Sequence, residues 1–277
     1  MNPTAAAVGR FYDQWTPLLW SAAGTTFQGG LIQREAGEPV TPASSNRYLA
    51  ELAGVKRGDR VLDAGCGVGG PACDIAAALP GVVIDGITNS AVQASIGRRH
   101  VAAAELRHRV AIHLGDFHEL PFRGDTFDVV LFLEVTGYSP DRAVLYEEAA
   151  RVLKPGGTVY VKDLFRRAGP LTAEQRAAMR NFDTLWGCVG SPTLPDTVAA
   201  MTAAGLTDVT TREYPHVDME HYYRSMTAPG GGLNAFGEAF LHRDRIDVSA
   251  GLPVLFGEAR ARKPVGEPPP GGNIVGY

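Results

Sequence analysis

The stretch VLDAGCGVGG, residues 61–70, decides the fold of this 277-residue chain. Apolar residues lead to an acid and then to four glycines, which is typical of a buried strand that turns through a glycine loop into a helix. Glycines lack side chains, so backbone N–H groups can approach a bound ligand closely at the start of that helix. The stretch therefore predicts a cofactor pocket of the nucleotide-binding type.

Short apolar runs alternate with helical stretches on the C-terminal side of this loop. The runs are RVLDAG, VVIDGI, VAIHLGD, DVVLFLE and TVYVKDLF, and helices are expected at residues 71–79, 90–104 and 141–153. Strands that alternate with helices imply a parallel sheet covered on both faces. The predicted fold class is therefore α/β, Rossmann-like, with a mainly parallel, doubly wound sheet and a helical lid or cap.

The length suggests one large domain with additions rather than two full domains. Residues 11–32 (FYDQWTPLLWSAAGTTFQGGLI) are rich in aromatic residues and glycine, which favours a lid over a site. Further helices are expected at 173–186 and 195–204, and strands at 206–214 and 253–262. The predicted organisation is a lid segment at 1–50, a core at 51–263 with a helical cap inserted around 170–235, and a Pro- and Gly-rich, disordered tail at 264–277.

Composition limits the class of partner. The hydrophobic share of 45% and the charged share of 20% are those of a globular protein, and a net charge of −4 offers no surface for nucleic acid. No run of apolar residues predicts a membrane span or a signal peptide, so we expect a cytoplasmic protein with a small-molecule partner. Cys66, Cys73 and Cys188 show neither paired nor zinc-type spacing and predict no metal site. A homo-oligomer is left open.

The glycine loop by itself is compatible with two classes of cofactor. Gly65, Gly67 and Gly70 would suit a dinucleotide pyrophosphate, and Asp85 lies about 20 residues further on, where a ribose-binding acid is expected. Asp63, however, precedes the first glycine by two residues, and its charge would repel a pyrophosphate. The acid favours a cationic ligand instead.

Two later motifs also favour the cationic cofactor over a dinucleotide. They are GDF at 115–117, which follows a strand, and LKPGG at 153–157, which precedes one. With them, the block 60–165 resembles the core of the class I S-adenosylmethionine-dependent methyltransferases. Within that family it is most similar to the sterol and isoprenoid (prenyl diphosphate) C-methyltransferases. The matching phrases are VLDAGCGVGGPACDIA at 61–76, GITNSAVQ at 86–93, GDFHELPF at 115–122, FDVVLFLEVTGYSP at 127–140 and RVLKPGG at 151–157.

The resemblance implies that S-adenosylmethionine is the cofactor and assigns residues to each of its parts. The methionine part would lie on Asp63, Gly65 and Gly67. The adenine would hydrogen-bond to Asp116 and pack on Phe117, with Leu133 close to the cofactor. Many class I enzymes carry an acid for the ribose where this chain has Thr88, so Thr88 and Gln93 are assigned to the ribose side.

Methyl transfer from a sulfonium mainly requires alignment and the exclusion of water. If an alkene carbon is methylated, the substrate becomes a carbocation, and a base must remove a proton. Glu134 ends the run DVVLFLE, at the sheet edge where open α/β folds bind ligands, and the resemblance implies a proton-accepting or substrate-orienting role for it. The other interpretation is a carboxylate that caps a turn or binds a backbone amide.

Aromatic side chains are candidate walls for an apolar substrate, and cation-π contacts of about 0.5–2 kcal/mol each could stabilise a cation. Tyr12 and Trp186 are assigned to the catalytic set with Glu134. The residues assigned to the substrate are Trp20, Phe27, Tyr138 and Tyr222. A prenyl diphosphate would also need an anion clamp, for which the sequence has no clear cluster, and Mg²⁺ is expected only with such a substrate.

The predicted function is carbon methylation of a small isoprenoid, a prenyl diphosphate or related alkene, in specialised metabolism, with Glu134 as base. The alternative is O- or N-methylation of a phenolic, polyketide or indole-type natural product. The two differ in whether Glu134 or a histidine, such as His118 or His221, faces the transferable methyl group. From other classes, a nicotinamide dehydrogenase and a non-catalytic cofactor-binding protein stay open.

Overall fold

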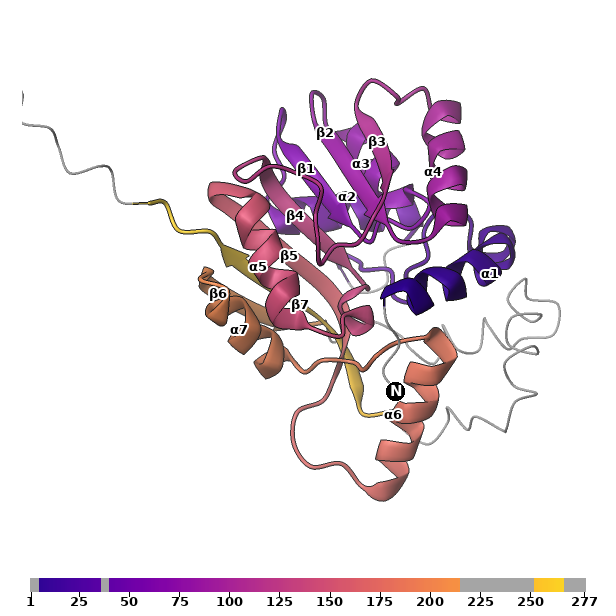
Figure 1. The fold of residues 1–277 in the computed structure, drawn as a ribbon, viewed down its shortest axis with the longest axis vertical. Coiled ribbons are helices and arrows are strands. Elements are labelled where there is room, and N and C mark those ends of the chain that lie inside the picture. Colours follow the sequence, from indigo (N-terminus) through magenta and orange to yellow (C-terminus); the bar gives the residue numbers. More distant parts are fainter. Residues whose placement is uncertain (1–4, 36–39, 215–251, 267–277) are drawn as a thin grey trace, which may run out of the picture.

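The computed structural model describes residues 5–35, 40–214 and 252–266. Seven strands form one sheet in the order β3-β2-β1-β4-β5-β7-β6 (Figure 1). They are β1 (Arg60–Ala64), β2 (Val83–Thr88), β3 (Val110–Leu114), β4 (Phe127–Leu133), β5 (Leu153–Arg166), β6 (Thr207–Glu213) and β7 (Val254–Arg262). Strands β1 to β5 pair in parallel, and β7 is antiparallel to both β5 and β6. The predicted mainly parallel α/β sheet is confirmed.

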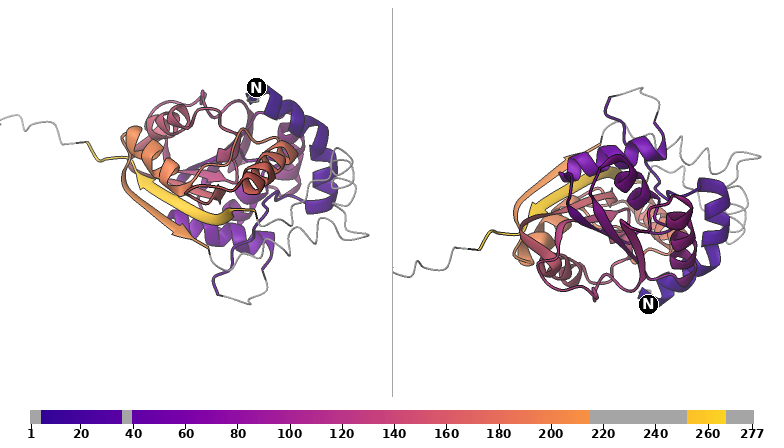
Figure 2. Two further views of the ribbon diagram at one scale, coloured as in Figure 1. Left: turned by 90° about the horizontal axis from the view of Figure 1, so that it is seen from below. Right: turned by 90° about the horizontal axis from the view of Figure 1, so that it is seen from above.

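Helices cover both faces of this sheet, as the views from below and above show (Figure 2). They are α1 (Ala5–Ala23), α2 (Pro42–Ala53), α3 (Gly70–Ala78), α4 (Ala91–Ala103), α5 (Arg142–Val152), α6 (Ala173–Trp186) and α7 (Leu194–Ala203), with a 3₁₀ turn, η1, at Thr136–Tyr138. None of these described helices is both long and apolar enough to cross a membrane.

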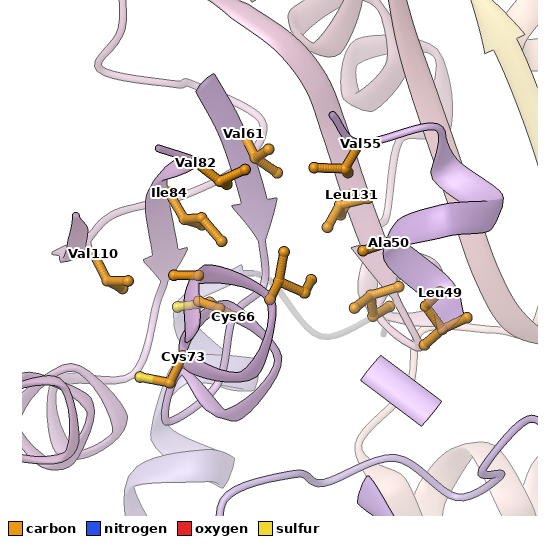
Figure 3. Packing of buried hydrophobic residues seen from close by; sticks show 14 of the residues in the cluster. Leu49, Ala50, Val55, Val61, Cys66, Cys73, Val82, Ile84, Val110 and Leu131 are labelled. Atoms are coloured by element: carbon orange, nitrogen blue, oxygen red, sulfur yellow. The ribbon is translucent and has the colours of Figure 1, made fainter. Parts of the chain in front are cut away.

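Alternation along the strands explains the two layers. Side chains of neighbouring strand residues point to opposite faces, so Val61 joins the cluster beneath α2, α3 and α4, whereas Leu62 joins the one beneath α5 and α7. Figure 3 shows the first cluster, in which Leu49 of α2 and Cys73 of α3 lie with Val61 and other strand residues. A strand buried on both faces reads as a continuous apolar run, as VVLFL of β4 does.

Two of the predicted segment boundaries, those of the lid and of the cap, do not coincide with the ends of helices or strands. The limit after residue 50 falls inside α2, whose Leu49, Ala50 and Ala53 are fully buried in the core. The cap around 170–235 includes α7 and β6, which belong to the sheet layer, since Met201 and Leu206 join the cluster beneath α5. Within its described part, α6 lies below the sheet as drawn in Figure 1 and packs on β5 and β7 through Met179 and Phe182. Residues 215–235 and most of the predicted tail lie outside the described residues.

Candidate functional site

A cavity lies at the carboxyl ends of β1, β2 and β4, bordered by α1 and the segment after it. It encloses about 830 Å³ of space between protein atoms, part of it open to solvent. All eight residues assigned to the cofactor from the sequence line it: Asp63, Gly65, Gly67, Thr88, Gln93, Asp116, Phe117 and Leu133. The assignment and the cavity thus coincide in space.

The glycine loop after β1 has a backbone that only glycine adopts easily. Gly65 and Gly67 have φ angles of 86° and 55°, in the left-handed region. A Cβ on Gly65 would lie 2.6 Å from Val135 Cγ1, so packing excludes a side chain there. A Cβ on Gly67 would meet nothing nearer than Phe27 Cδ2 at 3.9 Å, an ordinary contact, so the protein itself does not fill the space beside this residue. The loop therefore leaves room for a ligand at Gly67.

Asp63 is the buried acid of this loop, with only 2% of its surface exposed. Its Oδ2 has no hydrogen-bond partner in the described part of the chain. Burial raises the pKa of this carboxyl from 3.8 to about 7, because a low-dielectric site disfavours the charged form. A cationic amino group beside Oδ2 would restore the charged form, so the site fits the amino-acid part of S-adenosylmethionine.

Side chains for the other parts of the cofactor are already ordered by bonds to one another. The Thr88 hydroxyl donates to Gln93 Oε1 over 2.6 Å. Asp116 Oδ1 lies 2.7 Å from His118 Nδ1 and accepts the His118 backbone N–H over 2.9 Å. Burial opposes ionisation of Asp116, but these bonds and the nearby imidazole outweigh it, so the pKa of Asp116 is lowered. This acid is charged at neutral pH and can accept an amino N–H.

Glu134 follows β4 and lines the cavity, but its oxygens are largely occupied. Its φ angle of 58° is uncommon for a residue with a side chain. Oε2 accepts the Gly29 N–H over 2.6 Å, and Oε1 accepts the Gly30 N–H over 3.2 Å. Oε1 also forms an ion pair with Lys162, whose side chain is fully buried. The interpretation that Glu134 binds backbone amides describes this geometry.

The aromatic residues assigned from the sequence do not all reach the cavity. Tyr12, Phe27 and Tyr138 line it, and the hydroxyls of Tyr12 and Tyr138 are hydrogen-bonded to each other. Trp20 instead lies on the outer side of α1, edge-on to His100 of α4, with ring centroids 6.0 Å apart. Trp186 packs on the small cluster of Leu164, Met179, Phe182 and Phe256. Neither tryptophan is among the described lining residues, and Tyr222 lies outside the described residues.

The structure also locates two of the three residues on which the alternative functions depend, the ribose acid Asp85 and the histidine His118. Asp85, the ribose acid of the dinucleotide alternative, is not among the described lining residues and bonds to Arg60 and His113. His118 lines the cavity, yet its Nδ1 contacts Asp116 and its Nε2 contacts Ser139 Oγ at 2.8 Å, so both ring nitrogens are engaged. His221 lies outside the described residues. The sequence reasoning missed Lys162, a lysine inside the apolar run TVYVKDLF, and that interruption was its one visible signal.

The sheet order and the glycine-loop cavity together define a Rossmann-like class I methyltransferase fold. Residues 62–161 match the family described as "Methyltransferase domain". The chain is 34% identical over 207 residues to 27-O-demethylrifamycin SV methyltransferase of Amycolatopsis mediterranei, which covers 74% of this chain and 75% of that protein. This chain belongs to the family of S-adenosylmethionine-dependent methyltransferases.

Further proteins are similar to this chain in the sequence of the core or in the fold. The chain is 36% identical over 155 residues to the sterol 24-C-methyltransferase erg6 of Aspergillus fumigatus, covering 55% of this chain. The match spans only about 40% of the length of that relative. Among solved structures, the [4+2]-cyclase SpnF is similar with a TM-score of 0.76 and 25% identity, over 96% of this chain and 98% of that one. The predicted position near the sterol and isoprenoid group is confirmed at the level of the family core.

Proposed function

We propose that this methyltransferase methylates a hydroxyl oxygen of a neutral, largely apolar natural product of the phenolic or polyketide type. The observation that carries the proposal is the state of Glu134, whose carboxylate already binds Lys162 and two backbone N–H groups. An ion pair with no net charge does little to stabilise a carbocation beside it. This reverses the order of the two alternatives that the sequence suggested.

The charges of the cavity support a neutral substrate. Among the described lining residues, the carboxylates are Asp63, Asp116 and Glu134. Neither lysine nor arginine is among the described lining residues, so a diphosphate would have no strongly cationic side chain to bind there. In that case the Mg²⁺ expected with a diphosphate substrate is not needed for substrate binding. The relative that matches three quarters of both chains is named for a substrate lacking a methyl group on an oxygen.

When bound, S-adenosylmethionine would supply an electrophilic methyl group on a sulfonium. The substrate oxygen takes this methyl group as the methyl–sulfur bond breaks, and the hydroxyl proton leaves to solvent, to which the cavity is partly open. Asp63, Gly65 and Gly67 would hold its methionine part, Thr88 and Gln93 the ribose, and Asp116 and Phe117 the adenine, beside Leu133. Burial raises the pKa of the Tyr12 and Tyr138 hydroxyls above their usual range, so both stay protonated at neutral pH. We assign to this pair the orientation of the substrate hydroxyl, since a protonated phenol can both donate and accept a hydrogen bond.

Carbon methylation of a neutral alkene is the second candidate. The sterol relatives favour it, and so does the position of Glu134, which lines the cavity with 15% of its side chain exposed. In this mechanism Glu134 would accept the proton that the carbocation loses. The catalytic role given to Trp186 receives no support from its position. The cytoplasmic location and a homo-oligomeric state stay predictions.

One assay separates the two candidates. The protein is incubated with S-adenosylmethionine carrying a carbon-13 methyl group and with matched panels of hydroxylated polyketides and phenols, sterols, and prenyl diphosphates. The carbon-13 chemical shift of the transferred methyl group distinguishes a methoxy group from a C-methyl group. We expect methoxy products from the first panel. C-methyl products from sterols or prenyl diphosphates, with no methoxy product from any panel, would overturn the proposal.

A further inference from the structure

Lys162 is a charged residue in the middle of the sheet, on β5 between β4 and β7. Its side chain is fully buried, and a buried charge must be paired and hydrogen-bonded to be tolerated. Besides its ion pair with Glu134, Nζ donates to the Gly30 carbonyl over 2.6 Å and to Gln28 Oε1 over 3.4 Å. Nζ also lies 4.9 Å from the centre of the Phe256 ring. Two of these partners belong to the segment that follows α1.

That segment, residues 25–32, is here called the strap. Its backbone lies against the first turn of α3, because a Cβ on Gly70 would be only 2.1 Å from the Thr25 carbonyl oxygen. Phe27 of the strap lines the cavity next to Gly67. The strap therefore forms a wall of the cavity beside the glycine loop.

The strap is fastened at both ends by side chains of α2. Asn46 Nδ2 donates to the Thr26 hydroxyl over 3.1 Å, and the Ile32 N–H donates to Ser45 Oγ over 2.9 Å. Between these ends, Gln28 Nε2 donates to Asn46 Oδ1 over 3.2 Å, and the N–H groups of Gly29 and Gly30 donate to the Glu134 carboxylate. The backbone at Gly29 and Gly30 thus depends on Glu134, and Lys162 holds the carboxylate in place.

We propose that Lys162 is a positioning residue that retains the cofactor by acting through Glu134 and the strap. Glu134 keeps a left-handed backbone that a residue with a side chain adopts only when its surroundings enforce it. The Lys162 ammonium enforces it by fixing the carboxylate, which in turn fixes Gly29 and Gly30. With these glycines fixed, Phe27 stays against the glycine loop and closes the cofactor pocket.

This inference depends on the cofactor and not on the proposed substrate. S-adenosylhomocysteine is therefore the probe, and its dissociation rate from the whole chain is measured by stopped flow. In Lys162→Met we expect that rate to rise about tenfold or more, because affinity differences between related complexes arise mainly in dissociation. We also expect the amides of Gly29 and Gly30 to lose protection in hydrogen exchange, since local opening exposes them.

A matched control separates positioning from general stability. Met201→Ala removes a fully buried side chain from α7, in the other core cluster. It should lower the melting temperature while leaving the dissociation rate within about twofold of the parent, because distant sites act independently. If Lys162→Met does not fold, we measure the double variant Glu134→Gln, Lys162→Met in the same way. This variant leaves no unpaired buried charge and should also release the probe faster than the parent. Unchanged dissociation and retained protection of Gly29 and Gly30 in the folded variant would overturn the inference.

Discussion

Two carboxylates stand at the carboxyl ends of adjacent strands, Asp63 in β1 and Glu134 just after β4, and they differ in what surrounds them. Asp63 is almost wholly buried, and its Oδ2 has no partner in the described part of the chain. Glu134 binds an ammonium and two backbone N–H groups. Buried polar atoms are nearly always satisfied, so an unsatisfied one that lines a cavity, as Asp63 Oδ2 does, indicates a place for a ligand. A satisfied one marks part of the framework.

The same contrast separates the two halves of the cavity. The glycine-loop half contains a buried acid whose Oδ2 has no partner among the described residues, which weakens the fold when no ligand is bound. The strap half is closed by internal bonds from α2, β4 and β5. The cofactor side thus offers an unpaired carboxylate to a cationic group of the ligand. The strap side has its polar groups paired within the protein and forms a fixed wall of the pocket.

The largest effect is expected when the pair on the strap side is broken. Glu134→Gln or Lys162→Met alone should lower the free energy of unfolding by about 3–5 kcal/mol, because each leaves an uncompensated buried group. The double variant should lose less than the sum of the single losses. Chemical denaturation of the four proteins in a double-mutant cycle measures the coupling. Additive losses would mean that the two side chains do not act as a pair.

On the cofactor side, the matching change is Asp63→Asn, which keeps the shape and removes the charge. The Kd for S-adenosylhomocysteine should rise about 10- to 10²-fold, because a charged hydrogen bond contributes about 1.5–3 kcal/mol. The free energy of unfolding at pH 8 should not fall, since no partner of Asp63 Oδ2 is lost within the described protein. Calorimetry and denaturation check the two parts. A variant that binds as well as the parent would remove Asp63 from the site.

Sequence reasoning reached the cofactor half because its signals are local. The alternation of strands and helices, the glycine loop and the motif at Asp116 each depend on a few neighbouring residues. The strap half depends on register, since Lys162 lies opposite Leu133 on β4, beside Glu134, and both then meet Gly30 from the N-terminal segment. No local pattern encodes such a meeting of three distant segments.

The aromatic assignments show a second limit. Composition predicted an aromatic wall, and Tyr12, Phe27 and Tyr138 line the cavity. Whether a given aromatic on a helix faces inward depends on how the helix is rotated about its axis when it packs. Tyr12 and Trp20 share α1, but Trp20 faces α4 on the outer side. That rotation is set by tertiary contacts, such as Asp13 Oδ1 accepting the Ser90 hydroxyl at the start of α4 over 2.6 Å.

A pH series tests the charge of Asp63 more finely. Its pKa of about 7 without ligand means that affinity for S-adenosylhomocysteine should fall about tenfold for each pH unit below 7 and level off above it. The free energy of unfolding of the ligand-free protein should change with pH in the opposite direction. Because the folded pKa is raised above the unfolded value, the stabilisation from the protonated form is complete below about pH 4 and is lost as pH rises through 7.

Asp163, whose pKa burial raises to about 6, adds to the pH dependence of stability with the same sign. The control is therefore Asp63→Asn, which should lose the pH dependence of binding but retain the part of the stability change that belongs to Asp163. Calorimetric titrations from pH 5 to 9 supply both curves. Affinity that is flat across this range in the parent would show that Asp63 does not bind the cofactor as a carboxylate.

The smallest effect concerns the hydroxyl pair that borders both halves. Tyr12→Phe and Tyr138→Phe each remove one partner of the bond between the two hydroxyls and keep the aromatic ring. If the pair orients a substrate hydroxyl, kcat/KM on a confirmed hydroxylated substrate should fall about 2- to 10-fold, the equivalent of one hydrogen bond of about 0.5–1.5 kcal/mol. The Kd for S-adenosylhomocysteine should stay within about twofold, because the eight residues assigned to the cofactor are unchanged.

Trp20→Phe is the matched control, since this aromatic lies on the same helix but faces α4, and it should alter neither kcat/KM nor the Kd. A loss of kcat/KM in Trp20→Phe equal to that in Tyr12→Phe would trace the effect to the docking of α1 rather than to the hydroxyl.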